Sequence, residues 1–400
     1  MGHLLGTKSS LVPLIDRLNL YPIGLVDNDR LRQILALLFE EREAFVASRF
    51  PLHEATLAEL ADLSGVPAGE LKGILNRMAD KGLVMDLPYA GTTYYLLVPG
   101  LIGFMEFSFM RRRADLPQDL PLPELARLMN DYLRERGAMG QGAEFFGSAT
   151  QLTRALAYPE HIPVSSRIAA FEDARRIIED ADYCAVTLCY CRHKQEHLGH
   201  HCRKGAPVED TCMVLGEGAR FLVRRGFAKE QGKAAMIATL ERARALGLTH
   251  VTDNVRDRPS FICNCCRCCC ELMAGVQEGF TDGIAKTAFL AEIDPERCDY
   301  CGECLKTCNV KCIGLAKAAR IHGDRRARVD SAVCLGCGAC IDACPQGAIA
   351  LVPRLHPATP PRNRGILFAR ILWEKGRLWP FLVDRARQGW RALGARPRQH

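Results

Sequence analysis

The chain has 400 residues, of which 48% are hydrophobic and 25% charged, proportions that are usual for a folded protein and exclude a largely disordered one. This length exceeds that of a small single-domain carrier and predicts two to four compact units. The net charge of +7 arises in the last fifty residues, where eleven Arg and Lys stand against two acidic residues, so the first 350 residues sum to −2.

The cysteine count of twenty is the most unusual feature of the composition. Disulfide frameworks belong to short secreted chains, and the first twenty residues lack the basic start, apolar stretch and cleavage site of a secretion signal. No apolar run approaches the roughly 18 residues of a membrane-spanning helix. We therefore expect a cytoplasmic protein whose clustered cysteines bind metal.

The first hundred residues predict a small helical domain with a hairpin. One amphipathic helix is expected over residues 30–48, because its apolar residues recur at helical spacing. Thr56 can cap a second helix that ends at Gly65, and a third helix is expected over residues 68–81. Alternating apolar residues interrupted at Ala90 and Gly91 then predict a hairpin.

This order of elements resembles a winged helix-turn-helix domain, which we assign to residues 1–112. The resemblance implies DNA binding through the third helix, or else a protein-docking or structural role. Between positions 56 and 99 three basic residues stand against five acidic ones, a net charge of −2. Because duplex binding depends on neutralising phosphates, DNA is not the expected partner.

Residues 113–285 are predicted as a mainly helical, cysteine-rich domain. Cys184 lies in an apolar segment and is expected to be a buried thiol. Ten further cysteines are candidate metal ligands, because adjacent free thiols would be an oxidation hazard without a compensating gain. These ten are Cys189, Cys191, Cys202, Cys212, Cys263, Cys265, Cys266, Cys268, Cys269 and Cys270.

The metal of this middle region is left open between two kinds of site. Iron–sulfur chemistry is favoured, with one or two clusters, and one workable set joins Cys189, Cys191, Cys202 and Cys212 with part of the later run. Zinc is the rival, since tetrahedral Cys and His sets suit it, but the fixed finger-length spacer of a zinc ladder is missing. His193, beside Cys191, is the first histidine to test.

A catalytic role for the middle region is the second hypothesis. A cluster with an open coordination site could reduce a substrate, with His250, Asp253 and Asn254 on a substrate-facing loop. No Gly-rich nucleotide loop indicates a flavin or nicotinamide site.

Eight cysteines in the C-terminal third form two copies of the pattern C-x-x-C-x-x-C-x-x-x-C. The copies lie 36 positions apart and contain Cys298, Cys301, Cys304 and Cys308, followed by Cys334, Cys337, Cys340 and Cys344. A loop with a cysteine at every third position can wrap three thiolates around one [4Fe-4S] cube. This spacing is an iron–sulfur signature.

Residues 286–354, which contain both copies, resemble the bacterial-type 2[4Fe-4S] ferredoxin family. The resemblance implies two clusters, one bound by Cys298, Cys301, Cys304 and Cys344, the other by Cys334, Cys337, Cys340 and Cys308. Two departures stand out. Asn309 replaces the usual proline after Cys308, and Cys312 is an additional cysteine, expected to be a free thiol nearby.

Residues 355–400 form a basic tail that contains all three tryptophans. The mixture of apolar and basic residues over 364–391 is typical of an interfacial helix on a membrane surface or membrane complex, which would place the protein at the inner face of the membrane. The alternative is a terminal helix folded back on the body.

We therefore predict an α+β chain with a winged-helix-like domain, a helical cysteine-rich middle and a ferredoxin-like dicluster domain. Its predicted function is electron transfer between redox partner proteins. The alternatives are a reductase with its iron–sulfur site in the middle region, and a redox-sensing transcription regulator.

Overall fold

The computed structural model describes residues 7–112, 120–135, 140–162, 170–317 and 325–394. They form two compact units, residues 1–148 with 368–400, and residues 149–367. The boundary at 148 lies inside the segment 113–285 that the sequence suggested as one domain. Each unit is described by itself below.

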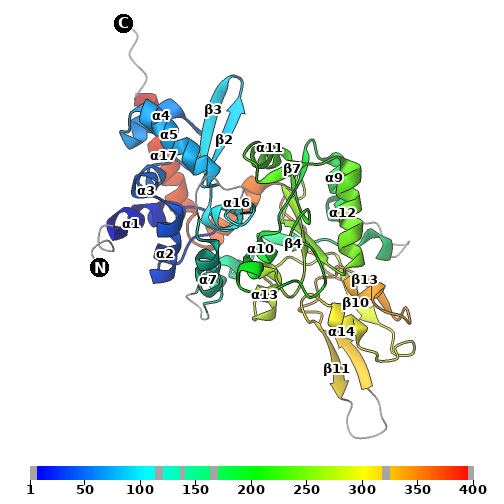
Figure 1. Ribbon diagram of the computed structural model, residues 1–400. Helices are drawn as coiled ribbons and strands as arrows, with labels where there is room; N and C mark the ends of the chain where they lie inside the picture. The colour runs from blue at the N-terminus through cyan, green and yellow to red at the C-terminus, as the bar shows by residue number, and fades with distance from the viewer. Residues whose placement is uncertain (1–6, 113–119, 136–139, 163–169, 318–324, 395–400) are drawn as a thin grey trace. The chain divides into compact units, whose positions relative to one another are not determined.

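The first unit is mainly helical with one three-stranded sheet (Figure 1). Its main elements are α1 (Thr7–Leu18), α2 (Asp29–Leu38), α3 (Glu41–Ser48), β1 (Ala55–Thr56), α4 (Leu57–Ser64), α5 (Ala68–Asp80), β2 (Val84–Tyr89), β3 (Thr92–Leu97), α6 (Met105–Phe107), α7 (Leu122–Leu133), α8 (Gln141–Phe146) and α17 (Leu378–Gly394). The strand order is β1-β3-β2, and the β2–β3 hairpin lies beside α4 and α5.

The local predictions for residues 56–97 are confirmed. Thr56 and Glu59 form the reciprocal capping box of α4, and Gly65 ends that helix in the left-handed conformation with φ 69°. The hairpin turns through Ala90 and Gly91, whose φ angles are both positive. These elements follow the expected order, and the winged-helix assignment itself stays a prediction.

The single helix expected over residues 30–48 is wrong, because α2 and α3 are separate helices. Phe39 adopts extended backbone angles after α2. Glu40 then starts α3 through a capping box with Glu43, whose side chain accepts from the Glu40 backbone N–H at 3.0 Å. A second N-terminal cap interrupts an otherwise continuous apolar periodicity.

The second unit contains a six-stranded sheet followed by two smaller strand pairs. Its elements are β4 (Thr153–Ala155), α9 (Ala174–Asp180), β5 (Cys184–Thr187), α10 (Tyr190–His197), β6 (Cys212–Leu215), α11 (Gly216–Arg224), β7 (Ala228–Glu230), α12 (Lys233–Ala245), β8 (Thr249–Asp253), β9 (Phe261–Cys265), α13 (Glu271–Gln277), β10 (Phe289–Ile293), α14 (Glu303–Thr307), β11 (Ile313–Lys317), β12 (Arg325–Val329), α15 (Ala339–Asp342) and β13 (Ile349–Pro353). Helix α16 (Arg364–Glu374) begins in this unit and ends in the first.

The middle region contains more helix than strand, as expected, but the prediction missed the antiparallel sheet β4-β8-β9-β6-β5-β7 that organises it. Its strands are three to five residues long, and β4, β5 and β8 are buried along their whole length. Short strands that are buried on both faces do not alternate between apolar and polar residues, so periodicity misses them.

The two faces of this sheet have different neighbours (Figure 1). On one face Val186, Met213 and Ile262 pack against helices α9 and α12 in an apolar core. The adjacent strand positions Cys212 and Cys263 point to the other face, where α10 and α13 lie, because successive side chains of a strand alternate. The strand pleat therefore directs the cysteines to one side.

Residues 368–394 of the C-terminal tail are mainly helical and pack within the first unit. Ile371 and Leu372 are buried. Glu144 accepts from Lys375 at 2.8 Å and from Arg377 at 2.6 Å, and burial is outweighed by these two cations, which hold the pKa of Glu144 below its usual value. Five of the ten exposed large apolar side chains among the described residues lie in α16 and α17: Ile366, Phe368, Trp373, Trp379 and Leu382.

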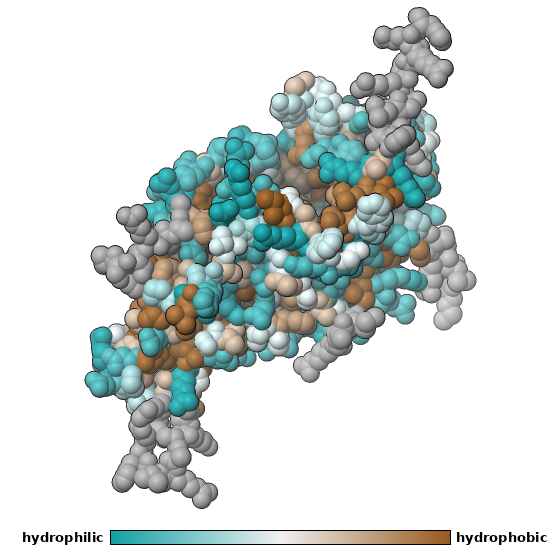
Figure 2. Space-filling model, turned by 180° about the vertical axis from the view of Figure 1, so that it is seen from behind, coloured by the Kyte–Doolittle hydropathy of each residue, from teal (hydrophilic) through white to brown (hydrophobic). Residues whose placement is uncertain are grey.

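The surface is otherwise mixed. On the face that Figure 2 shows, hydrophobic side chains form small groups separated by hydrophilic ones. Every helix in the described ranges is too short or too polar to cross a bilayer.

Candidate metal centres

The first ferredoxin cysteine set lines a small cavity. Cys298, Cys301 and Cys304 come from one loop and Cys344 from the second copy of the repeat, as the family resemblance implied. Gly302 precedes α14 with φ 80°, a conformation that favours glycine, and this turn brings Cys304 back toward the loop.

The second set lines a second small cavity. Cys334, Cys337 and Cys340 come from the second loop and Cys308 from the first copy. Each cavity therefore takes three thiols from one copy and one from the other, which is the exchange typical of two-cluster ferredoxins.

Cys312, expected to be a free thiol, is buried and also lines this second cavity. Its Sγ lies 3.5 Å from Cys308 Sγ. Hydrogen bonding from the Cys312 thiol lowers the pKa of both Cys308 and Cys334 to about 6, while the same contacts raise the pKa of Cys312. Cys312 is thus placed as a protonated donor between two thiolates.

Eight of the ten middle cysteines line a third cavity. We call it the six-cysteine cavity after the six that remain when Cys266 and Cys269, which lie close to Cys202, are set apart. In this six-cysteine cavity successive thiols are neighbours in a closed ring. The order around the ring is Cys189, Cys191, Cys270, Cys265, Cys263 and Cys212.

Sheet register explains how cysteines so distant in the chain meet. Met213 on β6 pairs with Ile262 on β9, so the next pair along the antiparallel ladder is Cys212 opposite Cys263. Cys265 follows two residues later on the same face of β9. Helices α10 and α13, which begin directly after Cys189 and Cys270, supply the remaining thiols.

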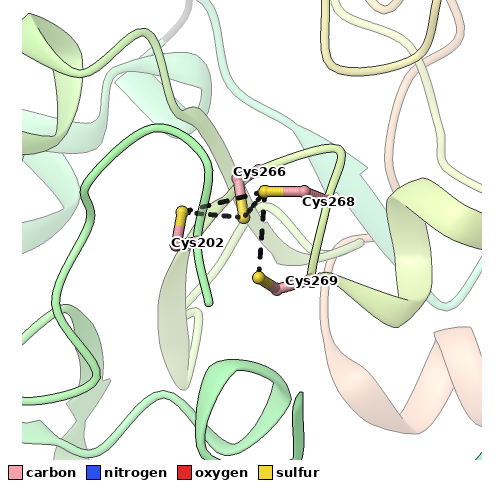
Figure 3. Close-up of side chains that lie close together, drawn as sticks. All are labelled: Cys202, Cys266, Cys268 and Cys269. Atoms are coloured by element: carbon pink, nitrogen blue, oxygen red, sulfur yellow. Dashed lines mark hydrogen bonds between the residues drawn. The ribbon is translucent and has the colours of Figure 1, made fainter. Parts of the chain in front are cut away.

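The remaining three cysteines of the later run form a separate group with Cys202 (Figure 3). The structure therefore does not bring Cys202 together with Cys189, Cys191 and Cys212, as the suggested set required. Cys184 is buried in the apolar core beside α9 and α12, as expected, and lies outside both groups.

A buried cation lies between the two groups. Arg192 is 2% exposed and borders the six-cysteine cavity. It donates to the Asn264 carbonyl at 2.8 Å, while its Nε and Nη1 have no hydrogen-bond partner. Burial opposes its charge, yet the thiols of Cys189, Cys266 and their neighbours raise the pKa of Arg192. A buried guanidinium among thiols favours their ionised, metal-binding form.

The histidines and polar residues singled out in the sequence lie elsewhere. His193 is buried and packs against His197, with ring centroids 4.9 Å apart and the rings tilted by 43°. His250, Asp253 and Asn254 are buried in or next to β8 rather than on a substrate-facing loop. Asp253 accepts hydrogen bonds from Ser260, which is a structural arrangement.

The three cavities adjoin one buried core. A single cluster of packed apolar residues includes five ring cysteines together with Cys304, Cys308, Cys312, Cys334 and Cys340 of the ferredoxin segment. Asn309, the departure from the family pattern, connects the two regions directly. Its side chain donates to the Gly247 carbonyl at 2.8 Å and to Thr249 Oγ1 at 2.9 Å, and accepts from the Arg267 backbone N–H at 3.2 Å.

This geometry indicates the class of site. Cavities lined by thiols from two copies of one cysteine loop are typical of a ferredoxin-type iron–sulfur domain. In agreement, the family described as the 4Fe-4S dicluster domain matches residues 297–348. A search of curated proteins found no match, and a search of solved structures found none either. The chain thus carries a ferredoxin-type domain with at least one [4Fe-4S] cluster.

Residues outside the cysteine motifs were the ones that sequence reasoning missed. Arg192 and Lys194 stand beside Cys191 on α10 and are both buried, and Lys194 Nζ lies 2.6 Å from Glu271 of α13. The available signal was a run of charged residues directly after a candidate ligand.

Proposed function

We propose that this protein transfers single electrons through three iron–sulfur clusters, two in the ferredoxin cavities and one in the six-cysteine cavity. One observation carries the proposal: the three cysteine-lined cavities adjoin the same buried core. A shared core favours short distances between the clusters that the cavities would hold.

Hydrogen-bond donors around the ferredoxin thiols would tune the potentials of the clusters. A [4Fe-4S] cluster supplies one-electron redox chemistry, and hydrogen bonds and burial tune its potential. The backbone N–H groups of Val310, Lys311 and Cys312 donate to Cys308, and Thr249 Oγ1 donates to Cys337 Sγ at 3.5 Å. These donors stabilise negative charge on the thiolates and so favour the reduced state.

Six thiols exceed the four that one cube requires. Two of the ring cysteines would then act as hydrogen-bond donors, in the manner proposed for Cys312, or bind a cluster with more iron atoms. Arg192 supplies positive charge at this cavity, which offsets that of the thiolates.

Iron and sulfide analysis of anaerobically purified protein, with an EPR redox titration, tests the proposal. We expect about twelve iron and twelve sulfide per chain, four for each cube. Cys265→Ser should remove the middle signal alone and Cys301→Ser one ferredoxin signal, while Cys184→Ser serves as the matched control. About eight iron atoms in the wild-type protein, unchanged in Cys265→Ser, would confine the clusters to the ferredoxin segment.

Two alternatives remain as further hypotheses with weaker support. A reductase would need substrate access at the six-cysteine cavity, and the candidate residues His250, Asp253 and Asn254 are buried. A redox-sensing regulator would bind duplex DNA at low salt in at least one redox state. Absence of binding in both states would exclude it.

For partners, we propose soluble redox proteins first and a membrane surface second, through the exposed Trp373 and Trp379 of the tail. The side chain of Trp390 lies outside the described residues. Replacing Trp373 and Trp379 with alanine should leave stability within about 0.5 kcal/mol, because both are exposed. Flotation with anionic vesicles that is equal for wild type and variant would remove the membrane proposal.

A further inference from the structure

Four thiols outside the six-cysteine ring converge on one point. Cys202 Sγ lies 3.6 Å from Cys266 Sγ and 3.8 Å from Cys268 Sγ. Cys268 Sγ lies 3.5 Å from Cys266 Sγ and 3.8 Å from Cys269 Sγ. Figure 3 shows Cys202 on one loop facing the other three on a second loop.

These distances match a single tetrahedral ion. Zinc–thiolate bonds of about 2.3 Å place the four sulfurs of a tetrahedron about 3.8 Å apart. A cube instead holds each thiolate on a different iron atom and points it outward, which separates the sulfurs more widely. The contacts of 3.5 to 3.8 Å therefore favour one ion over a cluster.

The ferredoxin thiols provide an internal comparison. Among the described residues, the Cys202 group is the one set of potential ligands whose donor atoms all lie within 4.8 Å of one another. The four thiols of the first ferredoxin cavity, which the ferredoxin resemblance implies bind a cube, do not meet this limit. The same chain thus presents thiols at two different spacings.

Local structure supports a closed site. Cys266, Cys268 and Cys269 lie on a turn in which the Cys270 N–H donates to the Cys266 carbonyl at 3.2 Å, and Cys266 and Cys269 also border the six-cysteine cavity. The Arg203 N–H donates to Cys268 Sγ at 3.4 Å, as backbone amides do toward metal-bound thiolates. Cys266 and Cys269 are buried in an apolar core with Ala206, Ala243 and Leu248.

We propose that Cys202, Cys266, Cys268 and Cys269 bind one Zn²⁺ ion in a structural site separate from the electron-transfer clusters. Binding converts four thiols to thiolates and releases their four protons to solvent, leaving a site of charge −2 that the nearby Arg192 partly offsets. Zinc is preferred to iron by the order of divalent metal affinities, and a closed set of four cysteines is typical of structural zinc.

The ion would hold the loop that carries Cys202 against the turn between β9 and α13. Two residues after Cys202, Lys204 donates to the Gly247 carbonyl at 2.6 Å and to the Thr307 carbonyl at 2.9 Å. Thr307 ends helix α14 of the ferredoxin segment. The zinc site therefore anchors a loop that holds the ferredoxin segment against β8. It stands whether or not the six-cysteine cavity contains a cluster.

Metal analysis of the anaerobically purified full chain tests this inference. We expect about one zinc atom per chain, with a zinc X-ray absorption shell of four sulfurs at about 2.3 Å. Cys268→Ser, at a partly exposed ligand, should lower zinc by about tenfold or more and leave iron and sulfide unchanged. Cys265→Ser should lower iron and sulfide and leave zinc unchanged. Cys184→Ser should change neither the zinc content nor the iron and sulfide content.

Three results would overturn it. Loss of iron and sulfide together in Cys268→Ser would make the site a cluster, and loss of iron without sulfide would make it a mononuclear iron site. A zinc absorption spectrum with nitrogen or oxygen ligands in the unaltered protein would place the zinc elsewhere. This last measurement needs no variant, so it holds even if the substitutions prevent folding.

Discussion

The ferredoxin segment and the six-cysteine cavity bring thiols together in different ways. The ferredoxin ligands lie within residues 298–344, on two short loops related by a repeat. The six ring cysteines span residues 189–270 and come from α10, β6, β9 and α13. The first arrangement depends on local spacing. The second depends on sheet register and helix placement, so changes in packing should affect it more.

The largest expected effect concerns which thiols bind the second ferredoxin cluster. Cys308→Ser should lose about four iron atoms per chain, because Cys308 receives backbone N–H donors and lies at the repeat position of a ligand. Cys312→Ala should keep its iron and shift the reduction potential, because only an S–H donor is lost. Iron analysis and EPR titration measure both. Equal iron loss in the two variants would show that Cys312 is a ligand.

A buried ion pair offers a way to disturb the six-cysteine cavity alone. Lys194 is fully buried, and its Nζ lies 2.6 Å from Glu271, which directly follows the ring cysteine Cys270. Lys194→Met would leave the carboxylate without its cation and should cost about 3–5 kcal/mol in the free energy of unfolding. The middle EPR signal should weaken while the ferredoxin signals persist.

The control for this change is Arg176→Met. Arg176 pairs with Asp180 at 3.2 Å on the exposed surface of α9, and such pairs contribute about 0.3–0.5 kcal/mol. Anaerobic urea unfolding compares the two variants. If Lys194→Met were no more destabilising than Arg176→Met, the ion pair would not support the cavity.

The features that could be predicted from sequence depend on local spacing, and those that were missed depend on long-range packing. The duplicated loops, the capping box of α4 and the 90–91 turn depend on neighbours within a few residues, and local pattern predicted them. The sheet was missed because its strands are short and buried on both faces. The separation of Cys266 from Cys265 was beyond prediction, since it depends on where β9 ends and a turn begins.

Acid should destabilise the region around the six-cysteine cavity through protonation of His250. His250 on β8 is buried, and desolvation lowers its pKa to about 4. Its Nδ1 donates to Asn264 Oδ1 at 2.6 Å, between Cys263 and Cys265 of β9. The unfolded chain binds a proton near pH 6.5 that the folded chain accepts only near pH 4. This difference in pKa stabilises the folded chain above pH 6.5, and the stabilisation is lost as the pH falls toward 4.

Between pH 7 and pH 5 the loss is about 2 kcal/mol. Urea unfolding of the wild-type protein and His250→Gln at both pH values measures it, because the variant lacks the titrating group. The wild-type free energy of unfolding should fall by about 2 kcal/mol more than that of the variant. Parallel decreases would show that His250 accepts its proton equally in both states.

The smallest expected effect concerns the contact between the two regions. Asn309 belongs to the ferredoxin segment, yet its side-chain partners, Gly247, Thr249 and Arg267, belong to β8 and its surroundings. Asn309→Ala would remove the acceptor of the partly buried Arg267 N–H and should cost about 1–2 kcal/mol. Because no ligand changes, the iron content should stay constant.

Asn309→Pro separates this contact from the ferredoxin fold. It restores the residue that usually follows the fourth cysteine, as Pro345 does after Cys344, so the cluster loop should still form. It removes the same hydrogen bonds, so the loss of stability should match that of Asn309→Ala. The decisive result would be slower reduction of the middle cluster in both variants while the ferredoxin potentials stay unchanged. It would show that Asn309 holds the ferredoxin cavities and the six-cysteine cavity within electron-transfer distance. Unchanged rates would assign Asn309 to folding stability alone.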